Sequence, residues 1–328
     1  MLSSAISTRH KHTQNTKYQV PVPSFIMSAS SEHVQILHPS GDAMPRVGLG
    51  TWKAPKGVVR QAVQDAIRIG YRAIDCASDY GNEVEVGEGI RAAIDAGICK
   101  REDLFVTSKL WNTFHAKEHV EPACRRTLSD LGLDYVDLYL IHFPIALKYI
   151  PFETRYPPEW TVDPNVENPV MEFADITIRE TWEAMEAVHA LGLAKNIGVS
   201  NFNVALLMDL LKYAKVHPSV LQIEFHPLLQ QPTLRKFCAS KKIAVTGYSN
   251  FGGLSYIPLG MAHAKSAPEL LKDERLIEIG KRQGKSSAQV ILGFCVSENV
   301  IVIPKSTNAD RLKQNMEIFD LSFTEDDL

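Results

Sequence analysis

Three short apolar segments of the chain each end on residues that can carry or transfer a proton. The first, Ile74–Glu83, contains Asp75 and Tyr80, the second reaches Lys109, and the third reaches His142. Side chains of these types act as general acids or bases, or supply the charges that tune them. Because the carboxyl ends of parallel strands meet at one edge, we expect these four side chains to share one proton-transfer site.

Tyr80 is the residue that we expect to donate the proton. A free phenol has a pKa near 10, and a lysine ammonium beside it would favour the phenolate and lower that value. Lys109 could supply this charge, with Asp75 holding Lys109 charged and oriented, while His142 positions a carbonyl oxygen. The pattern predicts general-acid catalysis on a carbonyl, which typically accelerates a reaction by about 10²–10⁴. No cluster has metal-ligand spacing, so we expect no metal.

A carbonyl carbon that is reduced also needs an electron pair, and the segment Ile303–Arg311 could bind the carrier. It places Lys305, Ser306, Thr307 and Arg311 where the last predicted strand ends and the next helix begins. Helix N-termini and forked cationic groups suit phosphates. Taken without the other motifs, an exposed basic helix start explains this segment equally well.

Polar residues at other predicted strand ends fit the same site. Tyr248 could stack on a flat ring such as nicotinamide, and Asn201 and Gln222 could hydrogen-bond its carboxamide. Each residue alone is more simply a polar group at the end of a strand. Nearly every predicted strand ends in a polar residue, however, and charged groups rarely stay buried without partners. Together they favour a common site.

The elements that would position these residues alternate from about residue 45 onward. Short β-branched runs predict eight strands: Val47–Gly50, Ala73–Cys76, Leu104–Ser108, Val136–Ile141, Asn196–Val199, Val220–Glu224, Ala244–Tyr248 and Val300–Ile303. Amphipathic patterns predict helices between them: Val58–Ile69, Val84–Ala96, Val120–Leu131, Arg179–Leu191, Ala205–Tyr213 and Ala288–Ser297. Eight such α/β units in roughly 270 residues fit a closed (β/α)₈ TIM barrel better than an open sheet.

Two further segments belong to the predicted barrel. Residues 34–45 predict an N-terminal β-hairpin that caps its bottom. After the fourth strand, roughly 35 residues up to Thr177 show no periodicity, and a loop of that length in a compact domain usually serves as a lid or binding loop. It follows His142 directly, so we expect it to cover the active site. A doubly wound dinucleotide fold is disfavoured, because Gly48–Lys53 begins like G-x-G-x-x-G but ends on Lys.

The composition is that of an ordinary globular protein. Of 328 residues, 45% are hydrophobic and 22% charged, and the formal net charge of −3 offers no broad basic field for nucleic acid. No apolar run reaches the length of a membrane span. Five cysteines lie scattered without a C-x-x-C pair, which predicts reduced thiols in an intracellular, cytoplasmic setting.

The first thirty residues differ from the rest. They contain no Asp or Glu, are rich in Ser and Thr, and include Arg9, Lys11 and Lys17. A transit peptide has this composition, and a disordered leader or a start at Met27 fits as well. We therefore expect residues 1–32 to be a leader or targeting segment and residues 33–328 to form the barrel domain.

Together these motifs resemble the aldo-keto reductase family over about residues 33–328. The matching motifs are Gly48–Trp52, Gly70–Asp75, Tyr80–Glu83, Ser108–Trp111, Ile141–Pro144, Gly198–Phe202 and Ile303–Ser306. The resemblance implies metal-free hydride transfer from NADPH to an aldehyde or ketone, with a catalytic tetrad on Asp75, Tyr80, Lys109 and His142. It implies NADPH contacts on Ser200, Asn201, Gln222, Tyr248, Ser249, Lys305, Ser306, Thr307, Arg311 and Asn315.

Within that family the chain is similar to the fungal-type xylose (aldose) reductases. Leu110–Asn112, the run from Ile141 to Pro158, and His226–Pro232 carry this resemblance. It implies reduction of an open-chain aldose, such as xylose or a related pentose or hexose, to the alditol. We expect the pocket wall to consist of Trp52, Asp79, Trp111 and Phe143, with Asp79 contacting a substrate hydroxyl.

Two departures from the family matter. Relatives that use both coenzymes have a glutamate that reaches the adenosine ribose, and Pro258 stands there in the best alignment, while Thr307 replaces a frequent Asn. Since proline cannot accept those hydrogen bonds, we predict a strong preference for NADPH over NADH. The chain also stops at Leu328, where the family continues into a tail that lines the pocket. The C-terminal tail is therefore missing from this chain, either because the protein lacks it or because the sequence is incomplete.

The sequence leaves several alternatives open. Another family member could act on galacturonate, glyceraldehyde or a sugar phosphate, and Lys148 and Arg155 in the long loop could meet the phosphate. A barrel that binds NADPH as a sensor, like the channel-associated β-subunits, would bind the cofactor without turnover. The expected partner is a small carbonyl compound, and the sequence does not separate a monomer from a homodimer.

Overall fold

A computed structural model describes residues 33–328, apart from the side chains of Pro258 and His263. The predicted leader or targeting segment, residues 1–32, lies outside the described residues. The strands are β1 Val34–Ile36, β2 Ala43–Pro45, β3 Leu49–Gly50, β4 Ala73–Asp75, β5 Phe105–Leu110, β6 Val136–Ile141, β7 Ala194–Ser200, β8 Val220–Glu224, β9 Ala244–Tyr248 and β10 Val300–Val302.

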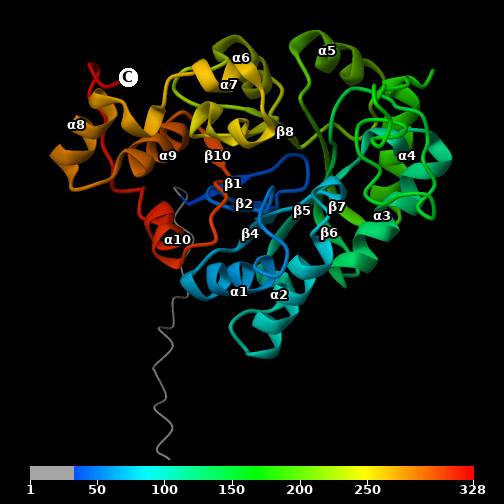
Figure 1. Cartoon of the computed structure of the whole chain (residues 1–328), viewed down its shortest axis with the longest axis horizontal. Helices are drawn as coiled ribbons and strands as arrows, with labels where there is room; N and C mark the ends of the chain where they lie inside the picture. Colours follow the sequence, from blue (N-terminus) through cyan, green and yellow to red (C-terminus); the bar gives the residue numbers. More distant parts are fainter. Residues whose placement is uncertain (1–32) are drawn as a thin grey trace, which may run out of the picture.

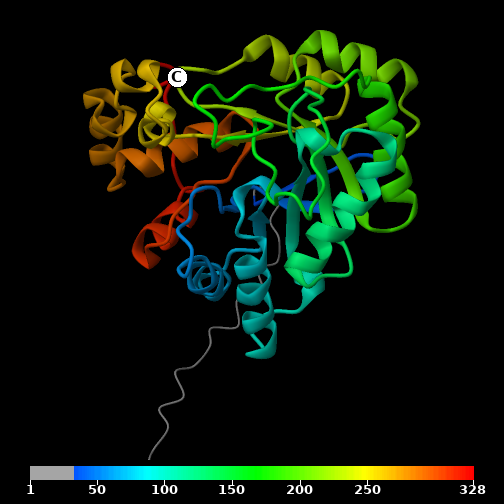
Figure 2. The same ribbon diagram turned by 45° about the vertical axis from the view of Figure 1, so that its right-hand side comes forward.

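Strands β3 to β10 form one parallel sheet in which neighbours in sequence are neighbours in space. The sheet closes on itself, because Val47 forms a parallel bridge with Val302. Beside this bridge the Gly48 N–H donates to the Val302 carbonyl at 2.8 Å, and the Val302 N–H donates to the Arg46 carbonyl at 2.9 Å. Helices surround the strands in Figures 1 and 2. The predicted (β/α)₈ barrel is confirmed.

The helices follow the strands as crossover elements. The α-helices are α1 Val59–Ile69, α2 Glu83–Asp95, α3 Lys117–Leu131, α4 Ile178–Ala190, α5 Val204–Tyr213, α6 Pro232–Ser240, α7 Ala262–Ser266, α8 Glu274–Gln283, α9 Ser287–Ser297 and α10 Ala309–Met316. Short 3₁₀ turns are η1 Ser78–Tyr80, η2 Arg101–Asp103, η3 Asn112–Phe114, η4 Gly252–Ser255, η5 Ile257–Leu259 and η6 Leu270–Lys272. The helices predicted from the sequence pattern did not include α6 or α8.

The N-terminal hairpin of β1 and β2 closes the amino-terminal end of the barrel. Leu37 and Met44 pack there against Ala73, Phe105 and Val220, the first residues of three barrel strands. The hairpin pairs antiparallel, with Val34 opposite Pro45. The predicted hairpin cap is confirmed, and the opposite end of the barrel is left for the loops that follow the strands.

The long segment between β6 and α4 is held by its own contacts. Leu147 forms an antiparallel bridge with Phe173, and Lys148 pairs with Glu172 at 2.7 Å. The Arg155 guanidinium donates to the backbone carbonyls of Pro158, Thr161 and Val162. This loop therefore has a defined path, and both of its basic residues named above are engaged within it.

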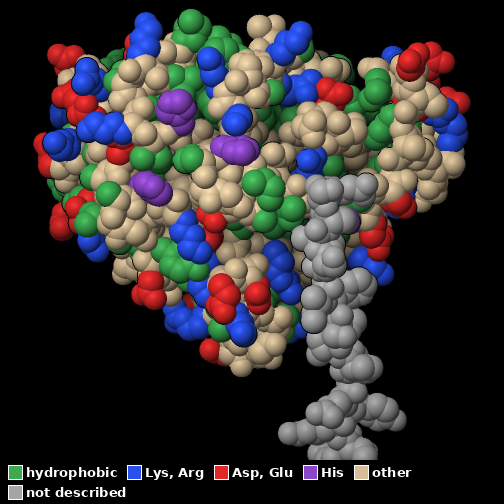
Figure 3. Space-filling view, turned by 180° about the vertical axis from the view of Figure 1, so that it is seen from behind, with side chains coloured by type: hydrophobic (Ala, Val, Ile, Leu, Met, Phe, Trp, Pro, Cys, Tyr) green, Lys and Arg blue, Asp and Glu red, His purple; other side chains and the backbone are tan. Residues whose placement is uncertain are grey.

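The surface carries charges of both signs. On the face shown in Figure 3, Lys and Arg side chains are interspersed with Asp and Glu wherever grey atoms do not cover it. Among the described residues, no helix combines the length and apolar character needed to cross a bilayer.

Candidate active site

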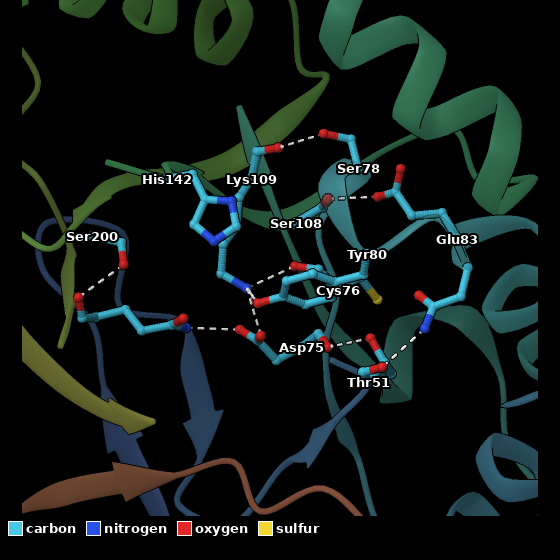
Figure 4. Close-up of polar contacts among 12 residues, drawn as sticks. Thr51, Asp75, Cys76, Ser78, Tyr80, Glu83, Ser108, Lys109, His142 and Ser200 are labelled. Atoms are coloured by element: carbon cyan, nitrogen blue, oxygen red, sulfur yellow. Dashed lines mark hydrogen bonds and ion pairs between the residues drawn. The ribbon is translucent and has the colours of Figure 1, made fainter. Parts of the chain in front are cut away.

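Four side chains meet at the carboxyl end of the barrel. Asp75 ends β4, Tyr80 ends η1, Lys109 lies in β5, and His142 follows β6. The Lys109 ammonium lies 2.5 Å from Asp75 Oδ1 and donates to Tyr80 Oη at 3.0 Å and to the Cys76 carbonyl at 2.8 Å. Figure 4 shows Lys109 between Asp75 and Tyr80, with the His142 ring nearby. The structure thus brings all four predicted residues together.

The strand that carries Lys109 is longer than predicted. We expected it to end at Ser108, but β5 continues to Leu110, and Lys109 pairs in register with Leu140 of β6. Lys109 is therefore inside the sheet rather than in the following loop. Its side chain is 0% exposed, so its ammonium needs a partner of opposite charge.

The backbone around Tyr80 is fixed by a tight turn. Gly81 ends η1 with φ +64°, a left-handed conformation that glycine adopts without strain. The next residue, Asn82, donates from its side chain to the Thr51 carbonyl at 2.9 Å. The Thr51 hydroxyl in turn donates to the Asp75 carbonyl at 2.9 Å. These bonds link the turn that presents Tyr80 to the ends of β3 and β4.

Both carboxylate oxygens of Asp75 are engaged. Lys109 approaches Oδ1, and Gln222 Nε2 donates to Oδ2 at 2.7 Å. Asp75 is 4% exposed, and a buried ion pair is stable only where further hydrogen bonds satisfy its remaining lone pairs. Gln222, which we expected to contact a nicotinamide carboxamide, therefore also holds Asp75 in place.

Tyr80 differs from the expectation in its pKa. Burial raises the pKa of Tyr80 well above that of a free phenol, and the charges of Asp75 and Asp79 raise it further. The predicted lowering was wrong, because the Lys109 charge is largely neutralised by Asp75 at 2.5 Å and does not offset the loss of solvent. Tyr80 is therefore a protonated phenol, the form that can donate a proton.

His142 is held as a neutral imidazole. Burial lowers the pKa of His142 well below its usual value, and the charges of Lys109 and His115 lower it further. Its ring meets the edges of the Tyr80 ring, at 5.8 Å between centroids, and of the Trp111 ring, at 5.2 Å. A neutral imidazole carries one N–H and can donate one hydrogen bond to an oxygen beside Tyr80.

Three predicted cofactor residues are joined to this group by hydrogen bonds. Asn201, at φ +65°, donates to the His142 carbonyl at 2.9 Å and accepts from Tyr248 Oη at 2.6 Å. The Ser200 hydroxyl donates to the Gln222 carbonyl at 2.9 Å. The ends of β6, β7, β8 and β9 are thereby tied together, and Tyr248 lies partly exposed at their edge.

The remaining predicted cofactor residues lie where β10 gives way to α10. A Cβ at Gly50 would stand 2.4 Å from the Ile303 carbonyl oxygen and 3.6 Å from the Lys305 nitrogen, so this segment passes directly against β3. Burial lowers the pKa of Lys53, and the nearby charge of Lys305 lowers it further. The Lys53 ammonium lies 4.3 Å from the Trp52 ring centroid. The other four predicted cofactor residues of this segment differ in exposure. Thr307 and Arg311 are exposed, Ser306 is buried, and Asn315 is buried beside Tyr71.

Ser249 belongs to the loop after β9. It has φ +50° and its hydroxyl lies 3.3 Å from Tyr256 Oη. Tyr256 in turn lies beside Trp52, with 6.2 Å between ring centroids. The sequence argument from Pro258 concerns a side chain outside the described part of the structure.

Aromatic side chains surround the space beside Tyr80 and His142. Trp52 lies 6.5 Å from Tyr80 between ring centroids, and Phe143 stacks on His142 at 4.9 Å. Trp111 and Phe143 both pack against Trp160 of the long loop, at 4.8 and 4.9 Å. The long loop therefore covers the site, as predicted. Its contribution through Trp160 was not foreseen, because an irregular loop gives no periodicity from which to place a side chain.

A buried carboxyl behind Tyr80 was also missed. Glu83 accepts from the Ser108 hydroxyl at 2.6 Å and from the Thr127 hydroxyl at 3.2 Å. Burial raises the pKa of Glu83 to about 7, opposed by the hydrogen bond from Ser108. Since Ser108 precedes Lys109 and Glu83 closely follows Tyr80, this contact links the two segments. The sequence did contain a hint, because Glu83 is part of the Tyr80–Glu83 motif. Glu83 also begins a helix, however, and an acidic residue in the first turn of a helix is usually interpreted as an exposed group that interacts with the helix dipole.

The fold and site have counterparts among known proteins. Residues 46–328 match the sequence model of the aldo/keto reductase family. The chain belongs to this family and is therefore an oxidoreductase, so the resemblance inferred from the motifs is confirmed.

Individual relatives and structures agree with this assignment. A probable NAD(P)H-dependent D-xylose reductase of Aspergillus flavus is 50% identical over 279 residues, which cover 85% of this chain and 86% of the relative. The NAD(P)H-dependent D-xylose reductase I,II of Candida tropicalis is 48% identical over 289 residues, 88% of each chain. The aldose reductase of Schistosoma japonicum superposes with a TM-score of 0.78 at 37% identity, covering 90% and 89%. A Bombyx mori aldo-keto reductase in complex with NADP gives 0.77 at 38% identity, covering 90% of each.

Proposed function

We propose that this protein reduces the aldehyde group of an open-chain aldose, with xylose as the reference substrate, to an alcohol at the expense of NADPH. The observation that carries the proposal is the series of contacts from Asp75 through Lys109 to the protonated Tyr80, beside which the rings of Trp52 and His142 lie. The similarity to relatives named as NAD(P)H-dependent D-xylose reductases supports the choice of substrate class and coenzyme.

The residues after β10 fit a phosphorylated dinucleotide. Among the described residues neither Lys305 nor Arg311 forms an ion pair, so both charges are free for phosphate groups. They flank the start of α10, which Asn308 caps by accepting from the Arg311 N–H at 3.0 Å. Ser306, Thr307 and Asn315 would complete the contacts at this end. Ser200, Asn201, Gln222, Tyr248 and Ser249 would hold the nicotinamide end beside Tyr80.

The geometry supports the following roles in the reaction. NADPH, when bound, supplies a hydride to the carbonyl carbon. The Tyr80 hydroxyl gives its proton to the carbonyl oxygen as negative charge develops there. Lys109, 3.0 Å from Tyr80 Oη, then stabilises the resulting phenolate. Neutral His142 donates a hydrogen bond that holds the carbonyl oxygen next to Tyr80, and Asp75 keeps Lys109 aimed at Tyr80.

The pocket wall would be formed by Trp52, Trp111 and Phe143, with Asp79 as the polar group that meets a substrate hydroxyl. Trp111 is held by the loop, since its Nε1–H donates to the Glu159 carbonyl at 3.0 Å. A sugar phosphate is less well supported as substrate, because Lys148 and Arg155 are occupied within the loop. Turnover also distinguishes this proposal from a cofactor-binding sensor, for which the same site would bind NADPH without reducing a sugar.

The test is coenzyme oxidation with a panel of carbonyl compounds. We expect the purified protein to oxidise NADPH in the presence of xylose or arabinose. We expect it to use NADH far less efficiently, because the charges of Lys305 and Arg311 suit the additional phosphate of NADPH. Galacturonate, glyceraldehyde and mannose 6-phosphate are the comparison substrates. NADPH binding without turnover on any of them would contradict the proposal, and comparable efficiencies with both coenzymes would contradict the coenzyme preference.

A further inference from the structure

The long loop brings an acidic residue to the pocket that the assigned site does not use. Its segment Pro157–Trp160 lies against both sides of the site. Pro157 faces Gly81, where an added Cβ would lie 3.5 Å from the proline ring. Trp160 packs on Trp111 with 4.8 Å between ring centroids. Glu159 lies between these two contacts, with its side chain exposed.

The backbone at Glu159 is held in an unusual conformation. Its φ is +60°, in the left-handed region that non-glycine residues rarely adopt. The carbonyl of Glu159 accepts from Trp111 Nε1 at 3.0 Å, and Trp111 is fully buried, so the position of this residue is fixed from the pocket side. Backbone strain of this kind often marks a functional site. Here it fixes the backbone of an exposed acidic residue beside Trp111.

Besides burial, the charge of Glu159 raises the pKa of Asp79. Asp79, adjacent to Tyr80, is partly buried. The pKa of Asp79 is raised to about 7, first by burial and then by the charge of Glu159, while the charge of Lys109 opposes this rise. The charged groups that act on Asp79 from neighbouring elements are therefore Glu159 of the loop and Lys109 of β5. The loop contacts at Gly81 and Trp111 place Glu159 beside the turn that carries Asp79, near enough for the two charges to interact.

We propose that Glu159 and Asp79 form an acidic pair at the pocket mouth, which selects uncharged carbonyl substrates against those carrying a carboxylate or a phosphate. The inference rests on the proposed carbonyl reduction at this site and names its substrate class. Like charges repel, and a site lined by one sign of charge changes the local concentration of charged substrates and their association rates by roughly 10–10³-fold. Aldoses would be admitted, whereas uronates and sugar phosphates would be excluded by charge.

The test uses two aldehydes that differ in charge but share a ring. They are 4-carboxybenzaldehyde, which is an anion at neutral pH, and its uncharged methyl ester. The readout is the ratio of kcat/KM for the anion to kcat/KM for the ester. In wild type we expect the ratio to be well below one, and in Glu159→Gln we expect it to rise roughly tenfold. Glu153→Gln, an exposed acid in the same loop, serves as the matched control and should leave the ratio unchanged.

A second readout separates charge from a change in loop shape. As pH rises through about 7, Asp79 ionises, so the wild-type ratio should fall further, and this fall should move to lower pH in Glu159→Gln. Glu159→Gly, which also relieves the left-handed strain, should raise the ratio as Glu159→Gln does. A ratio that is equal in wild type and both Glu159 variants would overturn the acidic pair while leaving the reductase intact. If wild type reduces neither aldehyde, the proposed function fails and the inference falls with it.

Discussion

Two buried aspartates at opposite ends of the barrel show how the same kind of ion pair serves different purposes. Asp137, near the start of β6, accepts from Arg101 at 2.7 Å and from the Val106 N–H at 2.9 Å, and pairs with Lys195 at 3.4 Å. Asp75, at the end of β4, pairs with Lys109 and accepts from Gln222. Both carboxylates are about equally buried, at 5% and 4% exposed.

The difference lies in what the cations contact next. The Lys195 side chain is 44% exposed, so the Asp137 network ends in solvent. Lys109 is wholly buried and extends instead to Tyr80 Oη in the pocket. The amino-terminal network therefore links structural elements, whereas the carboxyl-terminal one reaches the end of the barrel at which active sites lie.

The largest effect should come from breaking the ion pair at the pocket. Lys109→Met leaves Asp75 buried with Gln222 as its one remaining side-chain donor among the described contacts, which should cost roughly 3–5 kcal/mol of stability. Loss of the charge beside Tyr80 should lower kcat by about 10²–10³ as well. Denaturant unfolding and steady-state kinetics measure the two losses separately.

The double variant Asp75→Asn with Lys109→Met sharpens this result. Removing both charges eliminates the unpaired carboxylate, so most of the stability should return while kcat stays low. Recovery of activity together with stability would mean that Lys109 acts through the fold alone.

The corresponding change at the other end should affect stability alone. Asp137→Asn removes the charge shared by Arg101 and Lys195 and should destabilise the protein by roughly 3–4 kcal/mol. Under conditions where the variant stays folded, its kcat should remain within about twofold of wild type, because no contact of Asp137 reaches the pocket. A large fall in the kcat of folded Asp137→Asn would contradict the separation between the two ends.

A smaller, pH-dependent effect should come from Glu83, which lies behind the site. Its carboxyl has a pKa raised from 4.5 to about 7 in the folded protein, so the folded state binds more protons than the unfolded chain between these values. Stability should therefore fall as pH rises from 4.5 to 7, by up to roughly 3 kcal/mol. Glu83→Gln, which mimics the protonated form, should lose this contribution. An unchanged pH dependence of its unfolding free energy would contradict the account of Glu83.

The fold and the four central residues could be predicted because they follow from periodicity and from the strand-end rule. Residues at the carboxyl ends of parallel strands converge whatever the loops do, and this placed Asp75, Tyr80 and His142 correctly. Lys109 joined them although it lies inside β5, because its long side chain reaches the same edge.

The features that the sequence did not predict depend on contacts between segments that are distant in the chain. An irregular loop brings Glu159 beside the turn that carries Asp79, and the sequence of this loop contains no periodicity from which that position could be predicted. The pKa of Tyr80 was predicted in the wrong direction because its sign depends on burial and on how closely Asp75 neutralises Lys109. Neither quantity can be obtained from residue types and spacing alone.

The most direct test of the central claim is the kcat of Tyr80→Phe, measured alongside its affinity for NADPH. The Tyr80 hydroxyl is the proposed proton donor, and the substitution removes little besides that group. We predict that kcat with xylose or a simple aldehyde falls by about 10²–10⁴, while the Kd for NADPH changes by less than about threefold. A kcat within tenfold of wild type would contradict the account, since another group would then be delivering the proton.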